Sequence, residues 1–284
     1  MELRTENLYK SYRGKEALKD INIALKTGMY GLLGENGAGK STLMRILTTV
    51  DFQSKGTVFF DGTDIASLDE DYRKLVGYMP QEFNVYKNFT ANEFLEYIGA
   101  LKGMSRKVLQ RRIPEVLELV NLSDEAKRKV STFSGGMKRR IGIAQAILDD
   151  PKILFFDEPT AGLDAKERIK FSNIISAMSK DKIVLLSTHI VSDIEAMANS
   201  LIVIKQGKIL QAGEIDAMVG GLAGKVWEAL VDQTTFHKLS EARQIVRRKQ
   251  EGSNIRVRYV GEAYDGISNV PLQPSLEDYY MYVW

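Results

Sequence analysis

The chain has 284 residues, and its 39 Lys and Arg against 37 Asp and Glu leave a net charge of +2. A charge this close to balance gives no support to a nucleic-acid or other polyanionic partner. The lack of cysteine excludes disulfides, cysteine metal ligands and thiol catalysis, and two histidines, His189 and His237, are too few for a histidine-rich metal site.

The apolar runs are short. They are of the kind found at 153–156 (ILFF), 183–186 (IVLL) and 201–204 (LIVI), whereas a membrane-spanning helix needs roughly 20 apolar residues. The first ten residues carry charges where a secretory signal would be apolar. We therefore expect a cytoplasmic chain whose membrane role depends on a partner.

The N-terminal part alternates strand signals with a glycine-rich loop. Residues 21–25 (INIAL) alternate apolar and polar, and 57–62 (TVFFDG) close on an Asp-Gly turn. Between them, the apolar run 29–33 (MYGLL) leads into a glycine loop and then a helical pattern. This order predicts the entry to a parallel α/β core.

From about residue 84 to 150 the pattern is helical. Thr90 and Glu93 fit a capping box ahead of an apolar stripe. A further helix begins at Ser134-Gly135-Gly136, and its apolar positions recur at spacings of four, three and four, which predicts one buried face; these positions are Met137, Ile141, Ala144 and Leu148. We interpret the region as a helical insert.

After Pro151 the α/β pattern resumes with strands at 153–156 and 183–186, a helix from about 165, a short helix at 190–198 and a hairpin from 201. Strands that are apolar throughout predict a sheet covered on both faces. The segment 216–284 carries no clear chemistry. Its strand near IRVRYV and final aromatic helix LEDYYMYVW predict a small α+β appendage.

Residues 34–41 (GENGAGKS) fit the pattern G-x-x-x-x-G-K-[ST] between a strand and a helix. Gly34, Gly37 and Gly39 would let the backbone approach phosphates at a helix N-terminus. Lys40 would reach the β and γ phosphates, and the Ser41 hydroxyl would bind Mg²⁺. The alternative is a flexible glycine turn, which would not need a strand before it and a helix after it. The pattern therefore predicts a nucleoside triphosphate site.

Polar side chains follow three of the predicted strands. Asp157 and Glu158 end the strand ILFFDE, where Asp157 could hold Mg²⁺ through water and Glu158 could orient and deprotonate an attacking water. Gln81 follows VGYM and could reach Mg²⁺ or water, and His189 follows IVLLST and could face the γ phosphate. Each could also be an ordinary polar residue at a strand end, but the phosphate loop favours the functional interpretation.

Together these residues resemble the nucleotide-binding domain of an ATP-binding cassette (ABC) transporter over about residues 1–215. GENGAGKS resembles its Walker A loop, SGGMK (134–138) its signature motif, ILFFDE its Walker B strand and AGLD (161–164) its D-loop. Gln81 matches the Q-loop, His189 the switch histidine, and Tyr12 the aromatic residue that stacks on adenine.

The resemblance implies an α/β fold: a P-loop ABC ATPase core with an antiparallel β subdomain and an α-helical subdomain at about 84–150, followed by an α+β accessory segment at 216–284. It implies catalytic roles for Glu158, His189 and Gln81, and Mg²⁺ contacts from Ser41, Gln81 and Asp157. The residues implied in ATP binding are Tyr12, Gly34, Asn36, Gly37, Ala38, Gly39, Lys40, Ser41, Thr42, Ser134, Gly135, Gly136 and Asp164.

In this family the signature helix caps the ATP held by a second cassette. Ser134 offers a hydroxyl, Gly135 and Gly136 offer amides, and a helix N-terminus favours an anion. The resemblance therefore implies a dimer joined by ATP, either of two copies or with a related chain. Phe133 and Met137 depart from the family consensus of leucine and glutamine. A glycine-started helix that merely packs on a neighbour is the alternative.

A single cassette without a membrane span resembles a separate ATPase subunit that works with integral membrane permease subunits at the cytoplasmic face of the membrane. The ending PSLEDYY is similar to that of drug, antibiotic and bacteriocin exporter subunits. We therefore expect ATP-driven export of a drug, antibiotic, peptide or lipid-like cargo, with no nucleic-acid partner. The accessory segment could regulate, aid dimerisation or cover a sheet edge.

The alternatives are an importer ATPase and a soluble ABC ATPase that acts on a macromolecule. An SMC-type ATPase needs long heptad coiled coils between Lys40 and Asp157, and no sustained heptads occur there. A translation factor of the ABC type usually carries two cassettes, and one Walker A motif is present. A non-catalytic binding module is disfavoured by the intact Glu158 and His189.

Overall fold

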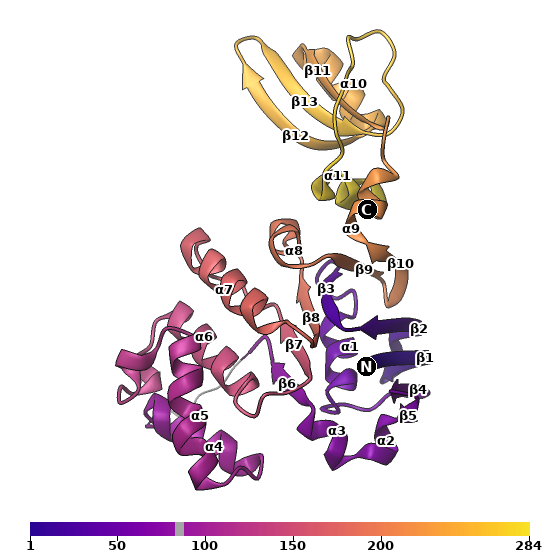
Figure 1. Cartoon of the computed structure of the whole chain (residues 1–284). Helices are drawn as coiled ribbons and strands as arrows, with labels where there is room; N and C mark the ends of the chain where they lie inside the picture. The colour runs from indigo at the N-terminus through magenta and orange to yellow at the C-terminus, as the bar shows by residue number, and fades with distance from the viewer. Residues whose placement is uncertain (83–87) are drawn as a thin grey trace. The chain divides into compact units, whose positions relative to one another are not determined.

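The computed structural model describes residues 1–82 and 88–284, so the predicted start of the helical insert at about residue 84 lies outside the described residues. The chain divides after Ala212 into two compact units, Met1–Ala212 and Gly213–Trp284. Both are drawn in Figure 1 and are described in turn.

An antiparallel sheet opens the first unit. Its order is β2-β1-β4-β5, with β1 (Glu2–Tyr12), β2 (Lys15–Lys26), β4 (Lys55–Phe60) and β5 (Thr63–Asp64). Arg13 and Gly14 join β1 to β2 with φ of 45° and 85°, and Asp61 and Gly62 join β4 to β5 with φ of 45° and 83°. Positive φ at both central residues is typical of the two-residue turns that match strand twist. The predicted Asp-Gly turn is confirmed.

The second sheet has six strands in the order β10-β9-β3-β8-β7-β6. These are β3 (Gly28–Leu33), β6 (Val76–Met79), β7 (Ile153–Asp157), β8 (Ile183–Thr188), β9 (Ser200–Lys205) and β10 (Lys208–Glu214). The five strands from β9 to β6 run parallel. Every residue of β7 and β8 is buried, which confirms the prediction of a sheet covered on both faces.

Helix α1 (Lys40–Leu47) joins the two sheets through one hydrophobic core. Its buried Leu43 and Met44 belong to the same cluster as Leu3 and Ile21 of the antiparallel sheet and Phe155 of β7. Helix α1 begins at Lys40, directly after the loop that follows β3. Its packing in the core therefore fixes the position of that loop. Two short helices, α2 (Ile65–Leu68) and α3 (Glu70–Lys74), then lead to β6.

The helical insert contains α4 (Ala91–Leu101), α5 (Arg106–Leu119) and α6 (Gly135–Ala146), which lie side by side (Figure 1), with short turns η1 (Ser123–Glu125) and η2 (Val130–Thr132). The capping box of Thr90 and Glu93 is present. The predicted buried face is confirmed at Ile141, Ala144 and Leu148, although Leu148 lies just past the end of α6 and Met137 is only half-buried.

Two further helices cover the parallel strands after the insert. Helix α7 (Ala165–Met178) follows β7 and is capped by Asp164, whose Oδ1 accepts a hydrogen bond from the Glu167 N–H at 2.8 Å. Helix α8 (Val191–Met197) follows β8. Both lie where the sequence pattern predicts them.

The second unit is an α+β fold. Its sheet has the order β12-β13-β11-β14, and its elements are α9 (Ile215–Gly220), β11 (Val226–Val231), α10 (Gln233–Ala242), β12 (Gln244–Glu251), β13 (Asn254–Val260), β14 (Val270–Pro271) and α11 (Leu276–Val283). One face of the sheet packs on α10 through Ala229, Leu239 and Val257. The predicted strand β13 and aromatic helix α11 are present, and β11, α10 and β12 add to them.

Candidate functional site

A cleft of about 700 Å³ lies over the loop that joins β3 to α1. Gly37 and Gly39 adopt φ of 82° and 111°, a region that favours glycine. A Cβ at Gly34 would lie 2.5 Å from the carbonyl oxygen of Ile204, so a larger residue would displace the loop from β9. The sequence places glycines where the backbone conformation and this close approach require them.

The side chain of Lys40 lies along this loop. Its Nζ donates hydrogen bonds to the carbonyl oxygens of Gly34 at 2.6 Å and Glu35 at 3.2 Å, and lies 3.3 Å from Glu158 Oε1. The Lys40 and Glu158 side chains are each 5% exposed. A charge held in so little water interacts strongly with any anion that reaches it.

Glu158 has the left-handed backbone conformation, with φ of 47°. Its N–H donates to the Ser187 carbonyl oxygen at 3.1 Å and to Ser187 Oγ at 3.0 Å. Its Oε2 pairs with His189 Nδ1 at 2.9 Å. The carboxylate therefore lies between an ammonium and an imidazole, an arrangement that can hold a water molecule and take its proton.

The neighbouring Asp157 is buried at the end of β7, where its Oδ1 accepts a hydrogen bond from Ser187 Oγ. Gln81 follows β6 and lines the cleft together with Glu158. The Gln81 carbonyl oxygen accepts a hydrogen bond from Arg139 Nη1 of α6 at 2.8 Å. Burial lowers the pKa of Arg139, and the carboxylates of Glu158 and Asp157 act against this effect.

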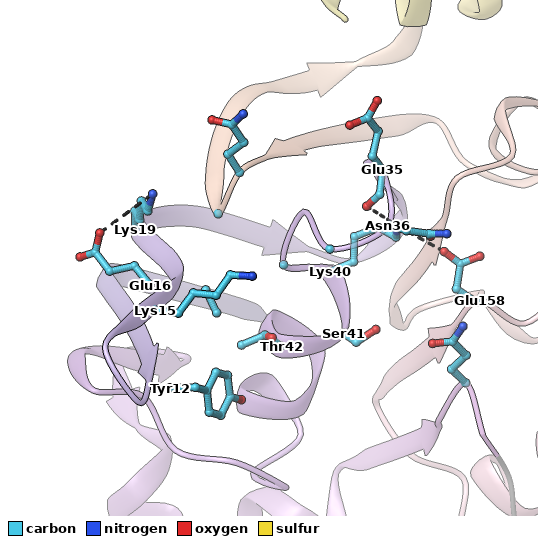
Figure 2. A pocket seen from close by; sticks show the side chains of 16 residues that line it. Tyr12, Lys15, Glu16, Lys19, Glu35, Asn36, Lys40, Ser41, Thr42 and Glu158 are labelled. Carbon is cyan, nitrogen blue, oxygen red and sulfur yellow. Dashed lines mark hydrogen bonds and ion pairs between the residues drawn. The ribbon is translucent and has the colours of Figure 1, made fainter.

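Tyr12 and Glu158 lie at opposite ends of the cleft, with Ser41, Thr42 and Lys40 between them (Figure 2). The spacing suits a nucleotide whose base lies near the aromatic ring and whose phosphates lie near the lysine. Asn36, Gly37 and Gly39 complete the lining of the phosphate end.

The signature residues lie outside this cleft. Among the described residues that line the nucleotide-sized cleft, none comes from 133–138 or 161–164. Gly135 instead lines a second hollow of about 330 Å³ with Gln81 and the segment 161–163. The structure therefore brings Tyr12, residues 34–42, Gln81, Asp157, Glu158 and His189 together within one chain, and leaves Ser134, Gly135, Gly136 and Asp164 outside that cleft.

The two signature glycines differ in their surroundings. A Cβ at Gly135 would meet no atom within 4 Å, whereas one at Gly136 would lie 2.8 Å from Glu167 Oε2. Glu167 also lies 3.6 Å from Arg140 Nε. A side chain at Gly136 would therefore require the flexible Glu167 carboxylate to shift, whereas Gly135 leaves space for another molecule.

Sequence reasoning missed several residues that support the site. Ser187 contacts both Asp157 and Glu158, and Asp193 accepts a hydrogen bond from Thr160 and another from Thr188 Oγ1 at 3.4 Å. Ser187 and Thr188 are polar residues at the end of an apolar strand, a signal that could have found them. Asp193 follows His189 by four residues in the sequence, which is a weaker signal.

The donors present suit Mg²⁺. Magnesium binds through one or two carboxylates together with substrate phosphates. Ser41 lines the cleft, and Asp157 ends β7, which packs against α1. The described residues contain no group of three or more His, Cys, Asp or Glu side chains able to hold a metal. The residues fit an ion that is bound together with a triphosphate.

The fold and the phosphate loop define a P-loop nucleoside triphosphatase. The family model for the ABC transporter matches residues 18–161. The chain belongs to the ABC transporter family, and the predicted fold is confirmed.

Curated relatives support this assignment. The chain is 38% identical over 217 residues to the uncharacterized ABC transporter ATP-binding protein YxlF of Bacillus subtilis (strain 168), covering 76% of this chain and 72% of the relative. It is 33% identical over 242 residues to the linearmycin resistance ATP-binding protein LnrL of the same organism, covering 84% and 76%. It is 31% identical over 285 residues to the Nod factor export ATP-binding protein I of Rhizobium meliloti (strain 1021), covering 96% and 84%.

A solved structure of a bacterial ABC transporter cassette as a dimer matches 75% of this chain and 98% of the cassette, with a TM-score of 0.68 and 28% identity. The same cassette in a dimeric post-hydrolysis state bound to ADP and Pi matches equally well. The chain is an ATP-binding ATPase subunit of the exporter type, as predicted. Such subunits dimerise and work with transmembrane partners. Within the described residues, no helix is long and apolar enough to cross a membrane.

Proposed function

We propose that residues 1–215 bind and hydrolyse ATP in the cleft over residues 34–42 and thereby drive export through membrane permease subunits. The observation that carries this proposal is the position of Glu158, whose carboxylate lies 3.3 Å from Lys40 Nζ and 2.9 Å from His189 Nδ1. Residues 216–284 act as an accessory segment, and the compact second unit that begins at Gly213 supports this division.

The geometry supports a proposed role for each of these residues. Tyr12 stacks on adenine, and Lys40 with Asn36, Gly37 and Gly39 holds the phosphates. Glu158 takes a proton from the attacking water, and His189 orients that carboxylate and contacts the terminal phosphate. Gly34, Ala38 and Thr42 shape the loop and the first turn of α1.

Ser41, Asp157 and Gln81 would hold Mg²⁺, which neutralises charge on the transferring phosphoryl group when it is bound. The hydroxyl of Ser187 fixes one oxygen of Asp157. The orientation of this carboxylate is therefore set before a ligand arrives.

The signature residues complete the site of a second cassette. Ser134 caps α6, where its Oγ accepts a hydrogen bond from the Met137 N–H at 3.2 Å, and the open space beside Gly135 admits another molecule. Asp164, at the start of α7, lies in the D-loop that would face the same partner. ATP then binds between two cassettes and stabilises their closed dimer.

A groove of about 480 Å³ is the proposed contact for the permease. It lies between residues near the ends of α1 and α3 and the C-terminal end of α4. Its lining includes Val50 and Leu101, which are 55% and 68% exposed, together with Arg73 and Lys74. Exposed apolar side chains rimmed by charge are typical of a protein-binding surface. An amphipathic cytoplasmic helix of the permease fits this chemistry.

The names of two relatives support a proposed cargo class. One is named for linearmycin resistance and another for Nod factor export. We infer export of an antibiotic or lipid-like molecule, with the chain at the cytoplasmic face of the membrane. An importer ATPase is not favoured by these relatives.

The first experiment is affinity purification of the tagged chain from detergent-solubilised membranes of its source cell. A stoichiometric multi-span protein is expected, and the preparation should hydrolyse ATP. If the chain is folded and hydrolyses ATP but no membrane protein co-purifies, the transporter proposal is wrong and a soluble ABC ATPase is supported.

The groove is tested in the same assay with Leu101→Glu. We expect loss of the co-purifying protein with the ATPase of the isolated chain retained, because Leu101 lies outside the nucleotide cleft. Ile169→Glu is the matched control, since Ile169 on α7 is 63% exposed and does not line the groove. Equal retention of the partner by both variants would place the contact elsewhere.

A further inference from the structure

Two side chains outside the recognised motifs hold the ring of Tyr12. The Tyr12 hydroxyl donates a hydrogen bond to Asp51 Oδ2, and Lys10 Nζ lies 4.7 Å from the centroid of the ring. Lys10 Nζ also donates to Asp51 Oδ1 at 2.7 Å and to the Phe52 carbonyl oxygen at 2.5 Å. The phenol, the carboxylate and the ammonium therefore form one closed network.

The network is partly buried beneath an accessible ring. The side chains of Lys10 and Asp51 are 11% and 16% exposed, whereas Tyr12 is 42% exposed. Because the ammonium covers one face of the ring, a base can stack only on the opposite face. The orientation of the ring is thus determined before a base is bound, which reduces the ordering cost of binding.

Asp51 owes its position to the helix that carries the phosphate-binding lysine. It follows the end of α1, and the N–H groups of Val50 and Asp51 donate to the Arg45 carbonyl oxygen at 2.9 and 3.0 Å. The Phe52 N–H donates to Asp51 Oδ1 at 2.7 Å. Tyr12 on β1 is therefore tied to the same rigid element that begins at Lys40.

We propose that Asp51 is a positioning residue for nucleotide binding, which together with Lys10 fixes the ring of Tyr12 in the orientation that stacks on adenine. This inference rests on the proposed ATP site and extends it. Asp51 acts through Tyr12 and contributes to recognition of the base. The phosphates are held by the other end of the cleft, which does not depend on this network.

The test compares a ligand that has a base with one that lacks it. In the full chain, Asp51→Asn should weaken ATP binding by about threefold to tenfold, the loss that corresponds to one ordinary hydrogen bond. Binding of inorganic triphosphate, measured by the same calorimetric titration, should not change. The KM for ATP should rise in the same proportion as the Kd.

Tyr12→Phe supplies a second variant. It keeps the aromatic ring and removes the hydroxyl group that donates a hydrogen bond to Asp51. It should weaken ATP binding as Asp51→Asn does, and the double variant should lose no more than either single one. Asp71→Asn is the control for the same chemical change, since the Asp71 side chain is 82% exposed on α3.

Two outcomes would overturn the inference. In one, Asp51→Asn leaves the affinity for ATP at the parental value. In the other, the affinities for ATP and triphosphate fall together, which would show a structural role without selectivity for the base. Failure of the parental chain to bind or hydrolyse ATP would instead refute the proposed function, so the two failures are distinguishable.

Discussion

Lys40 Nζ lies 3.3 Å from Glu158 Oε1, and both side chains are almost fully buried. The positive charge of Lys40, which is proposed to bind the phosphates, and the negative charge of Glu158, the proposed base, thus neutralise each other within the cleft. A triphosphate carries more negative charge than one carboxylate, so we expect Lys40 to turn to the phosphates when ATP binds. Glu158 then keeps its contact with His189 and is available to a water molecule.

The first prediction concerns Glu158→Gln. We expect ATP to bind at least as tightly as to the parental chain, because the amide no longer competes for Lys40. The kcat should fall by about 10²- to 10⁴-fold, the range typical of a lost general base. Light scattering or size exclusion with ATP should show a stable dimer, since ATP that is not hydrolysed keeps the cassettes closed.

Glu195→Gln is the control for this change, because Glu195 is an exposed acid on α8. It should hydrolyse ATP at the parental rate and form no trapped dimer. If Glu158→Gln hydrolyses ATP near the parental rate, another group activates the water.

The second prediction concerns Ser134→Arg. Ser134 is absent from the lining of the cleft in its own chain, so the isolated variant should bind ATP with parental affinity. Hydrolysis should be lost, because the arginine would block the surface that caps the nucleotide of the partner. Loss of ATP binding by the isolated chain would contradict an action in trans.

Mixing two inactive variants tests the same arrangement directly. In a head-to-tail dimer of Lys40→Ala with Ser134→Arg, one site receives an intact Lys40 from one chain and an intact Ser134 from the other. We therefore expect the mixture to regain part of the ATPase activity that each variant lacks. A mixture that forms dimers but stays inactive would show that both residues serve a site within one chain.

Local features of the fold and of the site were predictable from the sequence. The glycine loop, the capping box at Thr90 and the Asp-Gly turn each depend on residues a few positions apart, and all are present. The strand ends that carry Gln81, Glu158 and His189 were predictable as well. The carboxyl ends of parallel strands meet at one edge of a sheet, so residues that follow them lie close together.

Contacts between residues far apart in the sequence could not be predicted in this way. The Glu167 side chain lies against Gly136, and Tyr12 is held by Asp51. Neither contact leaves a periodic or motif-like signal, because each depends on how two elements pack. In the second unit α10 was missed, although Asp232 caps it and accepts a hydrogen bond from the Thr235 N–H at 2.7 Å, which is a local signal.

The third prediction concerns Asp193, a buried carboxylate on α8. Its Oδ2 accepts a hydrogen bond from Thr160, which follows Glu158 closely, and from Thr188, which precedes His189. Asp193→Asn should reduce the free energy of unfolding by about 1–3 kcal/mol, because buried hydroxyls lose a charged acceptor. Urea denaturation would measure this effect, with Glu195→Gln on the same helix as the control. Equal stability of the two variants would show that this link contributes little.

The fourth prediction concerns the pH dependence of stability at Asp51. Burial raises the pKa of this carboxyl, but hydrogen bonds from Lys10, Tyr12 and the Phe52 N–H outweigh that effect and lower it from 3.8 to about 2. A pKa that is lower in the folded chain gives stability that is present above pH 4 and is lost as the pH falls towards 2. The contribution is at most about 2.5 kcal/mol.

We therefore expect the parental chain to melt at a higher temperature than Asp51→Asn by a constant margin between pH 8 and about pH 5, the range in which this carboxyl is ionised in both folded and unfolded chains. The margin should narrow below about pH 4 as the carboxyl in the unfolded parental chain gains a proton. Asp71→Asn should show no such change, because Asp71 is exposed. A margin that stays constant into acid would show that the Asp51 carboxylate has no preferred partner in the folded chain, and Lys10 and Tyr12 would then have to be held by other contacts.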